Sequence, residues 1–163
     1  FFKPESLVST TLEARIMRNN YKILGINITA SVVIMYFVMF TMIDGLSDFF
    51  NNLNMTYMAL MMVAPMGVLM LLTMPSMYGN KKLNLALHAG FIALFVLAFM
   101  ATRQQVAISN VQFLRSMIPH HSGAILMCRK ASMSDPEIID LCSRIERSQR
   151  EEIDQMNKIL ARY

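Results

Sequence analysis

The stretch Ile23–Ile43, with the sequence ILGINITASVVIMYFVMFTMI, decides the fold class. It contains no charged residue, and two similar apolar runs follow it at Met55–Tyr78 and Leu83–Thr102. A helix needs roughly 20 apolar residues to cross the hydrocarbon core of a bilayer, and each run reaches that length. We therefore predict an all-α protein with three transmembrane helices and a lipid bilayer as its surroundings.

The overall composition agrees with this prediction and excludes other classes of protein. Of 163 residues, 55% are hydrophobic and 16% are charged, and the mean hydropathy is +0.41. Soluble domains carry roughly 25% charged residues, and disordered chains contain far fewer apolar ones. The net charge of +4 comes from bases that are spread along the chain. We expect no nucleic-acid partner.

Charged residues around the apolar runs predict the orientation in the membrane. The N-terminal segment is basic on balance, Lys81 and Lys82 precede the third run, and Asp44 and Asp48 follow the first. The positive-inside rule then places the N-terminus in the cytoplasm and the C-terminal part outside, here in a bacterial inner (plasma) membrane. The predicted domains are a cytoplasmic segment at 1–22, a three-helix transmembrane region at 23–102 and an extracytoplasmic domain at 103–163.

The tail after residue 102 changes to an amphipathic helical pattern. We expect the third membrane helix to run straight on to about Ala131, with Pro119 marking either a kink or the start of a new helix. Ser134–Glu137 combines a capping residue, a proline and an acid, which predicts the start of a last helix that ends near Ala161. These segments would form an antiparallel hairpin outside the membrane, one half of a ferritin-like bundle. So small a core requires a partner or a second copy.

Two cysteines, Cys128 and Cys142, flank the predicted turn of this hairpin. We favour their interpretation as two small buried apolar residues, because free cysteine is often buried. A disulfide is the alternative if the domain lies in an oxidising compartment.

The segment that points to chemistry is Met117–His121, with the sequence MIPHH. Met117 precedes His120 by three residues and His121 by four, so on a continuous helix it shares a face with each of them. Met127 follows His120 by seven residues and extends the same face. Imidazole and thioether together suit copper, and neutral imidazole is the form that binds a metal.

The last predicted helix offers Gln149, Glu152 and Met156 on one face. If the hairpin closes, this face could meet the two histidines, and Gln149 or Glu152 could orient an imidazole by accepting its second N–H. The alternative is a polar cluster that satisfies hydrogen bonds between two helices.

The stretch Phe113–Leu160 resembles the family known as domain of unknown function 305. The matching residues are Met117–His121, Ala124-Ile125, Asp135-Pro136 and the run Gln149-x-x-Glu152-x-x-x-Met156. The resemblance implies a helical hairpin or ferritin-like domain that binds copper, which in some members follows a three-helix membrane anchor. The copper ligands that it implies are Met117, His120, His121 and Met156.

Methionine is unusually abundant, with 17 residues, and five of them recur at every fourth position from Met58 to Met74. A path for Cu(I) through the membrane is one interpretation of this row. However, such a row drifts around a helix by about 40° per step, which favours packing or contact with lipid. His88 is the one ionisable residue in the third run, and it either has a function or reaches the membrane interface.

The sequence contains no arrangement typical of a catalytic site, so we expect no enzyme. The predicted function is a membrane-anchored copper-binding protein that presents a Met/His site on a periplasmic hairpin, for copper buffering or delivery. We expect it to form a homo-oligomer or to belong to a membrane complex. The alternative is a non-catalytic accessory or structural subunit of a larger membrane complex.

Overall fold

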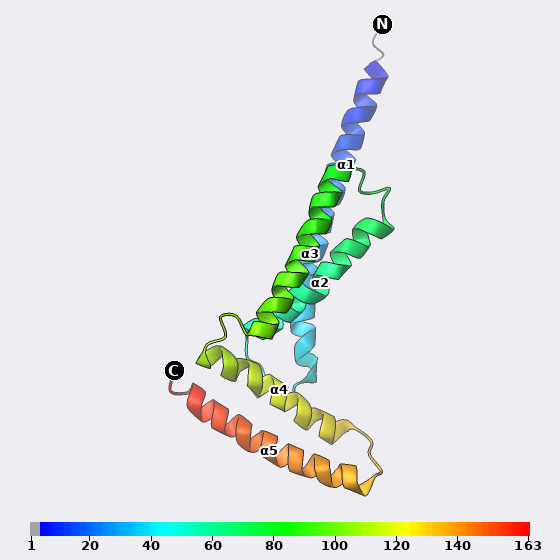
Figure 1. Cartoon of the computed structure of the whole chain (residues 1–163). Helices are drawn as coiled ribbons and strands as arrows, with labels where there is room; N and C mark the ends of the chain where they lie inside the picture. The colour runs from blue at the N-terminus through cyan, green and yellow to red at the C-terminus, as the bar shows by residue number, and fades with distance from the viewer. Residues whose placement is uncertain (1–3) are drawn as a thin grey trace. The chain divides into compact units, whose positions relative to one another are not determined.

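The computed structural model describes residues 4–163, with side chains from Arg15 onward, and every regular element in this part is helical. Two short 3-10 turns, Met39–Met42 and Leu46–Asp48, separate the first two helices. The all-α prediction is thus confirmed for the described residues (Figure 1). The five helices are α1 (Pro4–Val38), α2 (Leu53–Thr73), α3 (Lys81–Gln104), α4 (Asn110–Lys130) and α5 (Pro136–Leu160).

Three stretches are long and apolar enough to cross a membrane, namely Arg15–Met42, Leu53–Thr73 and Lys81–Gln104. Only 11%, 28% and 6% of their most apolar windows are buried inside the protein. Most of their apolar side chains therefore point outward, as Leu85 does with 74% of its surface exposed. An apolar exterior this extensive is unfavourable in water and matches hydrocarbon surroundings.

The start of α1 and the end of α3 differ from the sequence-based boundaries. Helix α1 begins at Pro4 and continues without a break through residue 22, so the polar N-terminal segment and the first apolar run are one helix. Helix α3 does not run on into α4, because Gln105 and Ala107 adopt φ angles of 51° and 57°. These left-handed conformations end a right-handed helix.

The end of α4 and both ends of α5 lie where the sequence signals predicted them, whereas the start of α4 at Asn110 was not predicted. Helix α4 runs through Pro119 without interruption and ends at Lys130, so the proline starts no new helix. Helix α5 begins at Pro136, and the Asp135 side chain caps it by accepting a hydrogen bond from the Glu137 N–H at 2.8 Å. An aspartate cap followed by proline at the first helical position is a favoured helix start.

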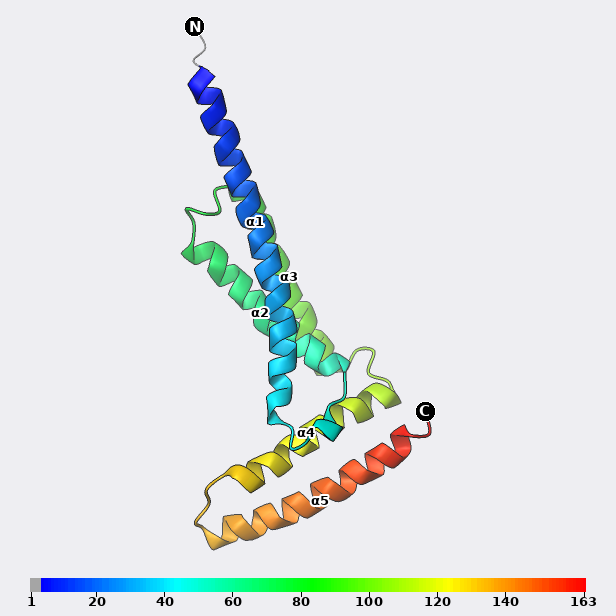
Figure 2. The ribbon, with the colours of Figure 1, turned by 180° about the vertical axis from the view of Figure 1, so that it is seen from behind.

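The chain folds as two compact units. The first unit comprises the residues up to Met35 together with Met58–Ala101, and the second unit joins Tyr36–Tyr57 to Thr102–Tyr163. The loop between α1 and α2 therefore belongs with α4 and α5. Helices α4 and α5 lie side by side in both views of the ribbon (Figures 1 and 2).

The second unit is held together by a small apolar core and by one covalent bond. Leu114, Ile118 and Ile125 from α4 pack with Ile153 and Met156 from α5. A disulfide joins Cys128 to Cys142 across the turn, with 5.3 Å between their Cα atoms. The preferred interpretation of two free buried cysteines was therefore wrong. The turn places the two residues opposite each other within the range that a disulfide spans.

Candidate functional site

His120 and His121 lie on different sides of α4. Successive residues of a helix are roughly 100° apart around its axis. His121 points toward α5 with 12% of its side chain exposed, whereas His120 is exposed to solvent. Their ring centroids are 6.0 Å apart. One imidazole is thus held between two helices while its neighbour stays accessible at the edge of the pair.

Glu152 of α5 is the charged residue that meets His121. Its Oε2 atom lies 3.0 Å from Nδ1 of His121, and its Oε1 atom accepts a hydrogen bond from the Ser148 hydroxyl at 3.1 Å. The buried Nδ1 atom is close to the carboxylate but is not aligned for a hydrogen bond. The contact is therefore electrostatic, and it places a carboxylate on one ring nitrogen of His121.

The pKa of His121 is lowered below its ordinary value of 6.5. Burial is the main cause because it disfavours the charged ring, and the neighbouring His120 acts in the same direction. The negative charge of Glu152 opposes both effects. The balance favours a neutral imidazole, which is the form that binds metals.

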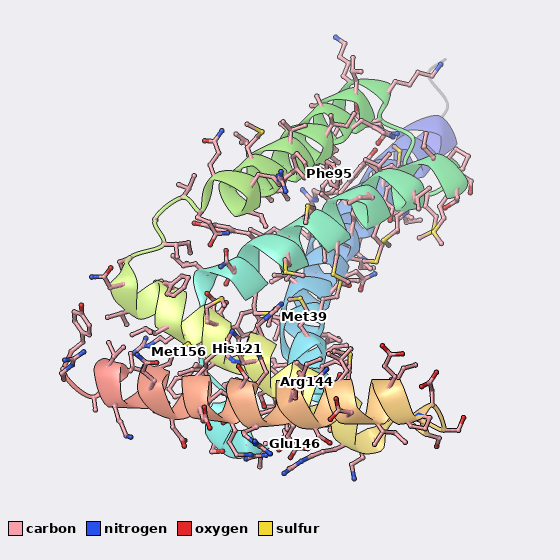
Figure 3. All side chains as sticks on the ribbon, turned by 60° about the horizontal axis from the view of Figure 1, so that its bottom comes forward. Met39, Phe95, His121, Arg144, Glu146 and Met156 are labelled. Atoms are coloured by element: carbon pink, nitrogen blue, oxygen red, sulfur yellow. A yellow bond between two sulfur atoms is a disulfide. The ribbon has the colours of Figure 1, made fainter. Side chains whose placement is uncertain are left out.

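Met117 and Met156 belong to the apolar core of the second unit. Met156 is 9% exposed and packs among Ile118, Ile125 and Ile153, and Met117 packs against the same cluster. Figure 3 shows His121 and Met156 where α4 and α5 face each other. Both thioethers therefore lie in the part of the α4–α5 pair that also holds the buried histidine.

The other two predicted ligands lie outside this cluster. Met127 is 53% exposed on α4. Seven residues separate it from His120, which corresponds to roughly 10 Å along a helix axis, so the two cannot share one ion. Gln149 is half-buried on α5 and makes no hydrogen bond to any residue that the structure describes.

The side chains that could bind a metal here include thioethers, which are soft ligands. Within residues 15–163, whose side chains the structure describes, no three side chains from His, Cys, Asp and Glu gather closely enough to hold a metal ion. A site built from the residues that do gather must combine the two imidazoles with a thioether. Such a combination suits copper better than zinc, magnesium or calcium.

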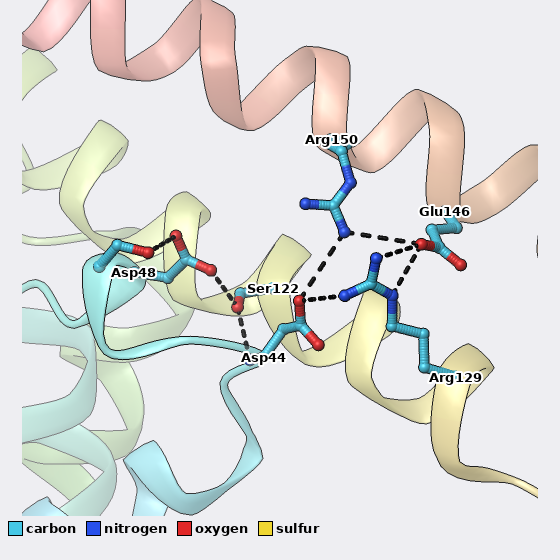
Figure 4. A network of polar contacts seen from close by, with 7 residues as sticks. Asp44, Asp48, Ser122, Arg129, Glu146 and Arg150 are labelled. Atoms are coloured by element: carbon cyan, nitrogen blue, oxygen red, sulfur yellow. Dashed lines mark hydrogen bonds and ion pairs between the residues drawn. The ribbon is translucent and has the colours of Figure 1, made fainter.

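Ser122, which the sequence did not single out, is completely buried beside His121. Its hydroxyl donates to Oδ2 of Asp48 at 2.5 Å and accepts the backbone N–H of Asp44 at 2.7 Å (Figure 4). The next residue, Gly123, packs tightly against the loop, since a Cβ atom there would lie 3.2 Å from the Met42 carbonyl oxygen and would push it away. The sequence signal that could have pointed to Ser122 is the presence of two aspartates in the α1–α2 loop together with a Ser-Gly pair in α4.

Arg129 extends this network to α5. Its guanidinium lies 2.8 Å from Asp44 Oδ2 and 2.7 Å from Glu146 Oε1, with Arg150 at 3.8 Å and 3.5 Å from the same oxygens (Figure 4). The hydrogen bond to Glu146 is the main reason why the pKa of Arg129 is raised. The α1–α2 loop, α4 and α5 are thereby joined around the segment that carries the two histidines.

His88 is a separate polar group within α3, in the first unit. Its Nδ1 atom lies 2.7 Å from the carbonyl oxygen of Asn84, which accepts the ring N–H. Its Nε2 atom is buried and has no hydrogen-bond partner among the described residues. The methionine row offers no enclosed site, since Met58 and Met62 of α2 and Met74 just after it are 39%, 49% and 43% exposed.

Comparison with known proteins identifies the family. Residues 97–160 match the profile described as Domain of unknown function (DUF305). An uncharacterized protein of Acanthamoeba polyphaga mimivirus is 37% identical over 119 residues, which cover 72% of this chain and 76% of the relative. The chain belongs to the DUF305 family. The DUF305 segment comprises the end of α3, all of α4 and all of α5, and so contains both histidines and Glu152. No solved structure matches the chain.

Proposed function

We propose that this DUF305 chain is a membrane-anchored copper-binding protein that buffers or delivers copper through a Met/His site on an outward-facing hairpin formed by α4 and α5. The observation that carries the proposal is the environment of His121, which is shielded from solvent and 3.0 Å from a carboxylate, and whose burial lowers its pKa. Metal-binding histidines commonly keep a carboxylate beside the second ring nitrogen. This leaves Nε2 of His121 as the ligand atom.

The neighbouring donors fit the same ion. Metal–nitrogen distances of roughly 2.0 Å place the centroids of two imidazoles on one ion about 5–6 Å apart, depending on the angle at the metal. The centroids of His120 and His121 are 6.0 Å apart. Met117 lies one helical turn before both rings and supplies the thioether. Copper bound there would exchange its ligands with a partner protein, which is the chemistry that buffering and delivery require.

Two features support an outward-facing hairpin. The Cys128–Cys142 disulfide is typical of an oxidising compartment. Lys81 and Lys82 lie at the N-terminal end of α3, whereas its C-terminal end leads into α4. The positive-inside rule expects the cytoplasm at the end with the two lysines. The bacterial inner membrane and the cytoplasmic N-terminus remain predictions from the charges.

The test uses the full chain, purified in detergent, loaded with Cu(I) and passed through a desalting column. We expect one copper per chain by elemental analysis and competition with a chromogenic Cu(I) chelator. His120→Ala combined with His121→Ala should abolish this binding. Met117→Leu, which keeps the size of the side chain, should weaken it by about tenfold or more, because one soft ligand is lost.

Met127→Leu is the matched control, because Met127 is a methionine of α4 that is exposed and too far from the histidines. It should bind copper like the unmodified chain. Helix content by circular dichroism shows whether each variant is folded. Unchanged copper binding in the double histidine variant would refute the named site, and no stoichiometric binding by the unmodified chain would refute the function.

An accessory subunit of a membrane complex is the second candidate, and it has its own supporting observation. Near the start of α5, Ile138, Ile139 and Leu141 are 48%, 44% and 47% exposed. Neighbouring exposed apolar residues of this kind are typical of protein–protein contacts. Copurification of the chain with another membrane protein in a fixed ratio, without bound copper, would favour this function.

A further inference from the structure

We infer that Arg115 binds the phosphate group of a phospholipid at the membrane boundary beside α4. This inference goes beyond the copper site and rests only on the membrane anchoring within the proposed function. It follows from where α4 holds Arg115, from the absence of a carboxylate partner among the described residues, and from the tyrosines and exposed apolar side chains of the same unit.

Two hydrogen bonds place the first turns of α4 at the end of a membrane span. The Leu53 N–H donates to Gln112 Oε1 at 3.0 Å, and Asn52 Nδ2 donates to the carbonyl oxygen of Arg115 at 3.4 Å. Leu53 is the first residue of α2, which is apolar enough to cross the bilayer. Arg115 therefore lies at the level where such a helix leaves the hydrocarbon and meets the headgroups.

The guanidinium of Arg115 has no carboxylate partner among the described residues. Its Nε atom is covered by protein and makes no hydrogen bond. The sequence contains no acidic residue from Phe49 to Ser134, so neither α4 nor the ends of α2 and α3 can supply one. Arg129, by contrast, contacts two carboxylates. A half-buried charge without a partner is unfavourable, and an anion from outside the chain relieves that cost.

The surroundings of Arg115 match those of a lipid headgroup. Tyr36 and Tyr57 lie near the same ends of the spans, where Tyr57 donates its hydroxyl proton to the Val106 carbonyl at 2.9 Å. Tyrosines are enriched at the membrane interface. Val106 and Phe113, elsewhere in the same unit, are 47% and 50% exposed, and they offer apolar surface to acyl chains. Apolar surface at this boundary favours a phospholipid over free phosphate, and the planar guanidinium suits either phosphate.

Thermal unfolding of the full chain in an uncharged detergent tests the inference. Phosphatidylglycerol should raise the Tm of the unmodified chain by about 2–4 °C, because a ligand that binds the folded state stabilises it. Diacylglycerol with the same acyl chains lacks the phosphate and should leave the Tm unchanged. Inorganic phosphate at the same concentration lacks the acyl chains and should also have no effect.

Arg115→Gln should weaken the apparent affinity for phosphatidylglycerol by about tenfold or more, since a charge-assisted contact is lost. Arg115→Lys keeps the charge and should retain part of the response. Arg147→Gln is the matched control, because Arg147 is an exposed arginine of α5 that has no ion pair among the described residues. Its response should equal that of the unmodified chain.

Each contrary outcome points to a different error. An equal Tm rise with inorganic phosphate would identify a free-phosphate site and overturn the lipid assignment. A full response to phosphatidylglycerol in Arg115→Gln would overturn the role of Arg115. Alkaline extraction of membranes tests the anchoring separately. Release of the unmodified chain by alkali would refute both the membrane anchoring and the lipid site, whereas a failure to bind copper would leave the lipid site unaffected.

Discussion

Ser122 occupies the point where α4 meets the α1–α2 loop, one residue after His121. Both the proton and a lone pair of its hydroxyl are used, by Asp48 and by the N–H of Asp44. Because this group is completely buried, water cannot replace either bond. The rotation of α4 about its axis, and with it the direction of His121 toward α5, is fixed by this one hydroxyl and by the core.

Replacement of Ser122 by alanine should destabilise the second unit by about 1–3 kcal/mol, because a buried N–H and a carboxylate lose their partner. Hydrogen exchange of residues 43–48 should become faster, and thermal unfolding in detergent should start at a lower temperature. Ser143→Ala is the control, since the hydroxyl of the exposed Ser143 donates to Ile139 of its own helix and to no other residue that the structure describes. Equal exchange rates in the two variants would contradict the role of Ser122.

At the scale of the elements, α2 and α3 approach each other at a glycine. A Cβ atom on Gly67 would lie 2.6 Å from Cζ of Phe91, so the ring fills the space that a side chain would occupy. Close approach at small residues is a common way to pack helices in a membrane, where no hydrophobic effect drives them together. Leu71 and Tyr78 lie further along the same side of the first unit, in its core.

Gly67→Ala should therefore lower the stability of the first unit by about 1–3 kcal/mol, because the added methyl group displaces the Phe91 ring. Gly90→Ala should leave stability unchanged or raise it slightly, since no atom lies within 4 Å of its added Cβ and alanine favours a helix. Both are measured as Tm in detergent. Combining Gly67→Ala with Phe91→Leu should recover part of the loss, and no recovery would argue against this contact.

At the scale of the whole molecule, the chain is divided between an apolar first unit and a polar second unit that carries the disulfide, His120 and His121. The second unit also contains the ends of the helices and the loop with Asp44, which Arg129 ties to Glu146. An isolated ion pair at a surface contributes little to stability. In the second unit, a buried serine and a disulfide stabilise the fold together with the ion pairs. The candidate copper site thus lies in the unit that contains the disulfide and this ion-pair network.

The disulfide makes the orientation of the whole chain testable. In intact cells, Cys128 and Cys142 should resist a thiol reagent until they are reduced, if the second unit faces an oxidising compartment as we propose. A tag placed after Tyr163 should be removed by a protease added outside the membrane, and a tag at the N-terminus should be protected. The reverse pattern of protection would contradict the proposed topology.

Much of the fold could be predicted from the sequence because its signals are local. An uncharged run as long as Ile23–Ile43 predicts a membrane helix by its length, and Asp135-Pro136 predicts the start of α5 by its capping chemistry. The break between α3 and α4 was missed. It depends on left-handed conformations at Gln105 and Ala107, and these residue types give no sign of them.

The candidate site could be predicted only in part. Spacing along α4 related Met117 to the two histidines, yet it could not exclude Met127, which lies two turns away and exposed. Spacing along α5 offered Gln149 and Glu152 equally, and only the packing of the two helices brings Glu152 to His121. Which rotation each helix adopts against its neighbour depends on the shapes of all the side chains between them.

The sequence by itself determined the helices, the family and the soft character of the donors, because hydrophobic length, caps and residue types act over a few positions. Only the tertiary structure decided which of these side chains come into contact. Ser122 and Asp44 are separated by 78 residues, and Cys128 and Cys142 by 14. These contacts form because burial of one small core aligns α4, α5 and the α1–α2 loop, and buried polar groups then accept only the partners that this alignment supplies.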